Sequence, residues 1–181
     1  MKTIATMRSA TGIPTGRLAV WWVLVSEVVI FGGVLVSYIM HRLGHAEWAE
    51  QAAHTNTWAG AFNTLVLLSS SLSAVLAHQA AEKGDGPKAA KLLRLTCVGG
   101  LVFLIVKSFE WTHEIREGFT IQSAGFWSYY YTAAGLHAFH VIAGMLIMLW
   151  VASTAAKNQE LHRVENVGIY WHFVDIVWIF L

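Results

Sequence analysis

The sequence is poor in cysteine and in charge. It has one cysteine, Cys97, and only 13% of its 181 residues are Asp, Glu, Lys or Arg. A single cysteine excludes a framework of internal disulfides, and because Cys97 lies inside an apolar run we interpret it as a buried structural residue. The formal net charge of +1 provides no basic footprint for nucleic acid. Phosphate-binding loops, nucleophile elbows, two-cysteine metal motifs and internal repeats are also missing, so the sequence predicts no catalytic centre of its own.

Apolar residues are abundant instead. Hydrophobic types make up 56% of the chain and the mean hydropathy is +0.52, a balance typical of integral membrane proteins. We therefore predict an all-α integral membrane protein with a polar arm over residues 1–17 and one domain over 18–181. The last of its helices, at about 25 Å, is short for a full crossing. The five transmembrane helices of this bundle are expected at about 18–40, 58–80, 92–115, 126–155 and 165–181.

Basic residues are distributed unevenly between the two sides of the predicted bundle. Nine lie in the arm and in the turns after the second and fourth helices, and two lie in the alternate loops. Because positively charged loops stay in the cytoplasm, we expect a cytoplasmic N-terminus and a C-terminus outside. The nine are Lys2, Arg8, Arg17, Lys83, Lys88, Lys91, Arg94, Lys157 and Arg163, and the two are Arg42 and Arg116.

One carboxylate, Glu27, interrupts the first apolar run. Counted from Leu18, it lies roughly 13 Å into a hydrocarbon layer about 30 Å thick. A charged side chain near the middle of a membrane costs on the order of 3 kcal/mol or more to insert. We therefore expect Glu27 to point into protein, toward a hydrogen-bonding partner, and to carry a proton.

Three charged residues of the third helix, Lys107, Glu110 and Glu114, are spaced by three and four residues and share one helix face. Lys107 can pair with Glu110 inside the bundle, while Glu114 approaches the outer interface beside His113. The pattern leaves two interpretations open. The group is either an internal ion pair that fixes helix packing or part of a proton relay.

Two histidines of the fourth helix, His137 and His140, lie three residues apart. Such a pair could bind a metal or a heme. However, the same helix face offers no carboxylate, and Cys97 is poorly placed. We favour a pair that hydrogen-bonds Glu27 or a serine of the second helix.

The fifth helix carries a second pair at the same spacing, His172 and Asp175. Asp175 lies well below the interface and must find a donor, for which His172 is the nearest candidate. This pair is interpreted as a clamp between helices. The second helix contributes Asn63 and several serines, residue types that hydrogen-bond across helices in lipid.

Four stretches in a fixed order resemble the cytochrome c oxidase subunit III family, and together they span nearly the whole chain. Glu165, five residues before the last of them, also matches. The stretches are Ser26–Phe31, Asn63–Ser70 with the following Ala77-His78, Gly135–Gly144, and Tyr170–Leu181 with the sequence YWHFVDIVWIFL.

The resemblance implies a non-catalytic subunit beside subunits I and II of a heme-copper terminal oxidase in a bacterial inner membrane. Heme and copper would belong to the partner catalytic subunit. Glu27 matches the intramembrane glutamate that reacts with hydrophobic carbodiimides, and the subunit would sustain proton uptake and turnover. We assign no catalytic residue and no metal ligand. We expect a buried polar network, made up of Asn63, Lys107, Glu110, His137, His140, Glu165, His172 and Asp175.

The resemblance also implies a bound phospholipid, with one reservation. Many family members have seven helices and bind lipid between the first two and the other five. The five helices predicted here lack that first pair, so no lipid-binding residue on it can be transferred.

Two other functions remain open. One branch of the family accompanies nitric oxide reductases, and only the metal content of the partner subunit would distinguish it. A small transporter or channel that uses Glu27 and Lys107 is a function of another class, and it predicts ion flux by the chain alone.

Overall fold

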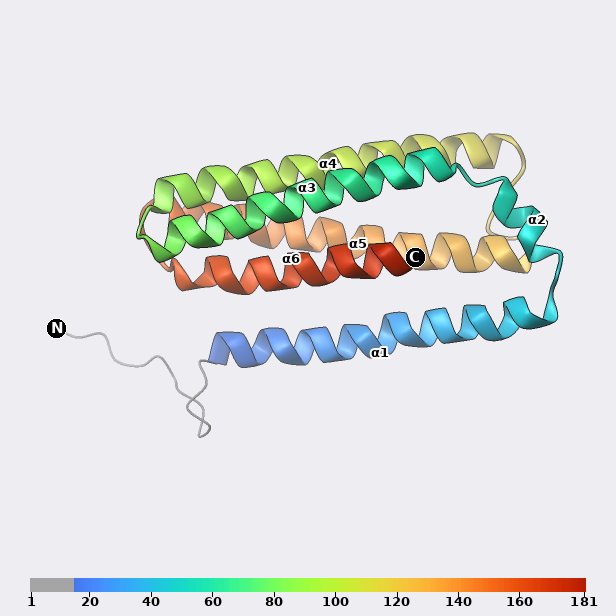
Figure 1. The fold of residues 1–181 in the computed structure, drawn as a ribbon, viewed down its shortest axis with the longest axis horizontal. Helices are drawn as coiled ribbons and strands as arrows, with labels where there is room; N and C mark the ends of the chain where they lie inside the picture. The colour runs from blue at the N-terminus through green and yellow to red at the C-terminus, as the bar shows by residue number, and fades with distance from the viewer. Residues whose placement is uncertain (1–14) are drawn as a thin grey trace.

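The structure, a computed structural model, describes residues 15–181, and every regular element in that range is an α-helix (Figure 1). The predicted arm, residues 1–17, lies outside the described residues except for its last three, which form the first turn of α1. The helices are α1 (Thr15–Gly44), α2 (Trp48–Ala53), α3 (Thr57–Glu82), α4 (Gly86–Arg116), α5 (Gly125–Ala155) and α6 (His162–Phe180).

Four of these helices, α1, α3, α4 and α5, are long and apolar enough to cross a membrane. The regular structure of residues 15–181 is therefore entirely helical, and these four helices are consistent with a multi-pass membrane protein. The shorter α6 has 19 residues and ends partway along α5 (Figure 1).

The segment between the first two predicted helices, residues 41–57, contains a short helix that was not predicted, α2. Trp48 anchors this short helix: its side chain is buried and packs on Phe126 of α5. Gln51 accepts a hydrogen bond from the indole of Trp127 at 2.8 Å. Six residues carry too weak a periodic pattern for sequence reasoning, so tertiary contacts decide this helix.

Two of the helix starts are fixed by side-chain caps. Asn56 accepts from the backbone N–H of Ala59 at 3.1 Å at the start of α3, and Asp85 accepts from that of Lys88 at 3.1 Å at the start of α4. Pro87 in the first turn of α4 removes a donor that would have no partner there. These caps explain why α4 begins six residues before the predicted position 92.

Helices α3, α4, α5 and α6 lie side by side as a bundle (Figure 1). Its core combines a few large side chains, among them Trp171 and Phe103, with many alanines, a composition that lets helix backbones approach closely in lipid. A Cβ atom built on Gly99 of α4 would lie only 2.5 Å from the Cβ of Ser70 on α3. The alanines with no more than 1% exposure are Ala74, Ala77, Ala89, Ala90, Ala152 and Ala155.

Helix α1 runs along one edge of the bundle and packs mainly on α5 and α6 (Figure 1). Its two buried residues, Leu24 and Phe31, are seven positions apart and define a narrow contact stripe. Large apolar side chains on its other faces are exposed to the surroundings of this chain. They include Trp21, Trp22, Val25, Val28, Val29 and Val36.

One contact joins the two turns at the end of the bundle that carries the α3–α4 connection. The backbone N–H of Gly86 donates to the side-chain oxygen of Asn158 at 2.8 Å. Asn158 adopts a positive φ of 55°, which asparagine tolerates better than most residues. A Cβ atom on Gly86 would lie 2.1 Å from the carbonyl oxygen of Ala155, so only glycine fits there.

Candidate functional site

Glu27 of α1 points into protein, toward α5. Its Oε2 atom lies 2.9 Å from Nε2 of His140, and the two side chains are 13% and 11% exposed. The ring of Phe31, one turn along α1, meets the imidazole edge-on at 5.3 Å between centroids. The 3.6-residue period places residues 27 and 31 on the same side of α1, so both side chains can contact His140.

The hydrogen-bond partners of His140 fix where its protons lie. Nδ1 lies 2.7 Å from the carbonyl oxygen of Leu136, and because a carbonyl only accepts, Nδ1 must carry a hydrogen. Nε2 then faces Glu27 either as the acceptor of a proton held by the carboxyl group or as the donor of an imidazolium. Either form would make the pair neutral overall, but Oε2 forms no hydrogen bond of acceptable geometry among the described residues, so the structure shows a close contact of the two groups and not a shared proton.

His137 behaves differently from His140, three residues away. Its ring is fully buried between Phe103 of α4, at 5.3 Å, and Trp178 of α6, at 5.2 Å. Neither ring nitrogen has a hydrogen-bond partner in the part of the chain that the structure describes. The expectation that His137 bonds to Glu27 or to a serine of the second helix is therefore wrong, because the aromatic neighbours turn its ring toward α4 and α6.

No group of three or more His, Cys, Asp or Glu side chains gathers within residues 15–181 in a way that could hold a metal ion. The rings of His137 and His140 face different helices, so the two do not converge on a common point.

The predicted pairing of His172 with Asp175 is also wrong. His172 Nδ1 meets the hydroxyl of Ser71 on α3 instead. Both carboxylate oxygens of Asp175 lack a hydrogen-bond partner among the described residues, although the residue is only 3% exposed. A serine on a neighbouring helix reaches the imidazole more directly than a side chain that leaves the same helix three residues later.

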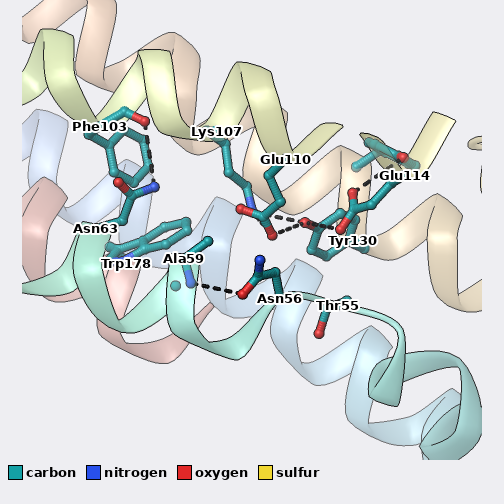
Figure 2. Close-up of polar contacts among 12 residues, drawn as sticks. Thr55, Asn56, Ala59, Asn63, Phe103, Lys107, Glu110, Glu114, Tyr130 and Trp178 are labelled. Carbon is teal, nitrogen blue, oxygen red and sulfur yellow. Dashed lines mark hydrogen bonds and ion pairs between the residues drawn. The ribbon is translucent and has the colours of Figure 1, made fainter. Parts of the chain in front are cut away.

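A second polar cluster joins α4 and α5 (Figure 2). Lys107 Nζ lies 3.1 Å from Glu110 Oε1, the pair predicted from their spacing, and both side chains are 6% exposed. The hydroxyl of Tyr130 lies within hydrogen-bond distance of Lys107, Glu110 and Glu114. Lys107 also lies 4.7 Å from the centre of the Tyr130 ring and 5.4 Å from that of Trp178, as cation–π contacts require.

The remaining two residues of the predicted network lie apart from each other. Asn63 of α3 is fully buried and reaches the carbonyl oxygen of Phe103 at 3.5 Å, a long contact, while its own Oδ1 has no partner among the described residues (Figure 2). Glu165 is not part of a buried network. It lies half-buried at the start of α6 and binds Arg17 of α1 through two contacts of 2.6 and 2.7 Å.

The sequence reasoning missed Tyr130 and Tyr131, which organise the second cluster. The signal that could have found them is the run of three tyrosines, 129–131, inside an apolar helix. A buried phenol needs a hydrogen-bond partner, and three consecutive phenols point to partners on more than one neighbouring helix. Tyr129, the first of the run, bonds Ser37 of α1 at 2.6 Å.

Comparison with known proteins shows which family this chain resembles. The family model described as "Cytochrome c oxidase subunit III" matches residues 3–181, nearly the whole chain. The match includes Glu27, His140 and the cluster around Tyr130, so it covers all the geometry described above.

Individual relatives agree with the family match. Cytochrome c oxidase subunit 3 of Corynebacterium diphtheriae is 34% identical over 163 residues, covering 86% of this chain and 80% of the relative. The protein of the same name from Thermostichus vulcanus is 30% identical, covering 87% and 80%. Subunit 3 of the cytochrome bo(3) ubiquinol oxidase of Pseudomonas aeruginosa is 32% identical over 168 residues, covering 88% and 78%.

Proposed function

The chain belongs to the cytochrome c oxidase subunit III family, and we propose that it acts as a non-catalytic transmembrane subunit of a heme-copper terminal oxidase in aerobic respiration. The observation that carries this proposal is the family match over residues 3–181. In the proposed complex the chain packs on subunit I and contacts subunit II, and heme and copper reside in the catalytic subunit.

The Glu27–His140 pair is the part of this chain that we propose to matter for proton handling. It brings two titratable side chains of different membrane-spanning helices within 2.9 Å of each other deep in the bundle. A neutral pair of this kind can lose or gain one proton without leaving two isolated charges in a low-dielectric setting. We propose that it supports proton uptake and that Glu27 reacts with hydrophobic carbodiimides.

The membrane arrangement that we propose has five crossings, made by α1, α3, α4, α5 and α6, in a bacterial inner membrane. The bias of basic residues supports a cytoplasmic N-terminus. The uncovered apolar faces of α1 support contact with lipid or with a neighbouring subunit on that side.

A cleft between α1 and the ends of α5 and α6 is where we propose that a phospholipid binds. Its volume is about 350 Å³, and Val34, Leu35 and Phe180 give it apolar walls. Arg42 and Tyr129 line the same cleft, and a guanidinium group suits a lipid phosphate. Lipid extracted from the purified complex should decrease in Arg42→Gln relative to wild type, measured by mass spectrometry.

Affinity purification of the tagged chain tests the proposed function. A much larger subunit with heme and copper should co-purify, and deleting the chain should shorten the working life of the oxidase more than it lowers the initial rate of oxygen reduction. Immediate and complete loss of oxygen reduction would contradict a non-catalytic role.

The metal content of the co-purified subunit separates the remaining possibilities. Heme with nonheme iron and no copper would indicate the nitric oxide reductase branch. Ion flux through liposomes that contain the chain alone would indicate a transporter. The Pseudomonas relative makes a quinol the second electron donor to assay besides cytochrome c.

A further inference from the structure

The cluster around Tyr130 brings two carboxyl groups and one ammonium group to a single phenol. The phenolic oxygen lies 2.8 Å from Lys107 Nζ, 2.8 Å from Glu110 Oε1 and 3.0 Å from Glu114 Oε1 (Figure 2). A phenol has one hydrogen to donate and two lone pairs to accept with. Lys107 donates to one lone pair, so the single hydrogen of Tyr130 can serve only one of the two carboxyl groups.

The other carboxyl group faces the phenol oxygen without a hydrogen from Tyr130. Two carboxylate oxygens cannot both bond the same phenol oxygen unless one of them is protonated and donates to the remaining lone pair. Glu110 Oε1 already faces the Lys107 ammonium at 3.1 Å, so Glu110 is the ionised member. If a carboxyl group of this cluster holds a proton, it is therefore Glu114.

The second oxygen of Glu114 gives the same answer. Oε2 lies 3.4 Å from the hydroxyl of Tyr131, whose hydrogen is used in a shorter bond of 2.7 Å to the carbonyl oxygen of Phe119. Both oxygens of Glu114 thus face phenols whose hydrogens can be used elsewhere. A proton on Glu114 would supply the hydrogen that one of these two contacts lacks.

Charge balance favours the same assignment. The groups that face Glu114 are Lys107 and Glu110 from its own helix and Tyr130 and Tyr131 from α5, and one ammonium can neutralise only one of two carboxylates. Glu114 is 3% exposed, and an uncompensated charge at such a site is costly. Binding a proton removes that charge.

A cleft connects the cluster with the surroundings at the end of the bundle that carries α2. Its volume is about 340 Å³. Glu110 Oε2, buried and without a partner among the described residues, belongs to a residue of its wall. The wall includes His54, Asn56, Ala59, Glu110, His113 and Glu114, and both histidines are exposed.

We propose that Glu114 is a proton-binding site, neutral at neutral pH, that exchanges its proton with water through the cleft between His54 and His113. The proton comes from cleft water and returns to it, and no bond between heavy atoms changes. This site is separate from the Glu27–His140 pair and does not depend on the role proposed for that pair.

Infrared difference spectroscopy of the purified complex at neutral pH, in H2O and in D2O, tests the proposal. Wild type should show a carboxylic-acid C=O band that shifts on deuteration, and Glu114→Gln should lose it. Ala59→Phe, which fills the cleft, should keep the band but slow its deuterium shift. The control Glu165→Gln, which alters the ion pair with Arg17 at the opposite end of the bundle, should leave the band unchanged.

Tyr131→Phe decides which carboxyl group holds the proton. It removes a neighbour of Glu114 only, so the band should change frequency. A band unchanged in Tyr131→Phe would assign the proton to Glu110 and overturn the proposal. Loss of a carboxylate band rather than an acid band in Glu114→Gln would also overturn it. If Glu114→Gln fails to assemble, the wild-type and Tyr131→Phe spectra still give the answer.

Discussion

Replacing His140 by leucine removes the imidazole that the structure places against the Glu27 carboxyl. The two side chains are 11% and 13% exposed and lie 2.9 Å apart, so Glu27 would then face apolar neighbours such as Phe31. An ionised carboxylate left there would cost about 3–5 kcal/mol. Because Glu27 can keep its proton, we expect the smaller cost of one unsatisfied buried group, about 1–3 kcal/mol.

Two further variants separate the polar contact between Glu27 and His140 from simple packing. In Glu27→Gln the side-chain amide can donate to His140 Nε2, which is free to accept because Nδ1 carries the hydrogen bonded to Leu136. We expect a change below about 1 kcal/mol. The double variant Glu27→Leu with His140→Leu leaves no polar group behind, and apolar replacement of both members of a buried pair is often neutral or stabilising.

The assay is the denaturant midpoint at which the chain leaves the purified complex, together with labelling by a hydrophobic carbodiimide. His140→Leu should lower the midpoint most, and the double variant should recover most of the loss. Labelling should persist in His140→Leu and disappear in Glu27→Gln. Equal destabilisation by His140→Leu and by the double variant would refute the reasoning, because it would mean that the imidazole contributes only its volume.

Three other predictions concern the bundle, each read from the same unfolding midpoint. Gly86→Ala should destabilise by about 1–3 kcal/mol through overpacking, whereas Gly60→Ala, where a Cβ atom meets nothing within 4 Å, should be neutral or stabilise by about 0.5–1 kcal/mol. Trp171→Ala should cost about 3–5 kcal/mol, and the exposed Trp58→Ala should stay within about 0.5 kcal/mol. Arg17→Ala should lower the midpoint only slightly, and this effect should vanish at high salt because the ion pair is exposed.

Residues whose placement depends on a helix period could be predicted from the sequence. The spacing of Lys107 and Glu110 predicted that they pair. The cost of burying a charge in lipid predicted that Glu27 points into the protein. Both arguments use one helix and one physical rule, so they need no knowledge of the neighbouring elements.

Residues whose partner lies on another helix could not be predicted in the same way. Sequence spacing suggested Asp175 for His172, but the rotation of α6 relative to α3 brings Ser71 closer. The same spacing treated His137 and His140 as one unit, whereas α1 lies beside one ring and α4 and α6 lie beside the other. Relative helix rotation comes from the packing of the whole bundle, and a period within one helix carries no information about it.

The bond between Gly86 and Asn158 has a consequence for the order in which this protein can be assembled during synthesis. The two residues are 72 positions apart, so the connection between α3 and α4 leaves the ribosome long before its partner exists. The α3–α4 hairpin must therefore enter the membrane with the N–H of Gly86 still bonded to water. The hydrogen bond from Gly86 to Asn158, which joins the two hairpins at that end, can form only after the α5–α6 connection has emerged.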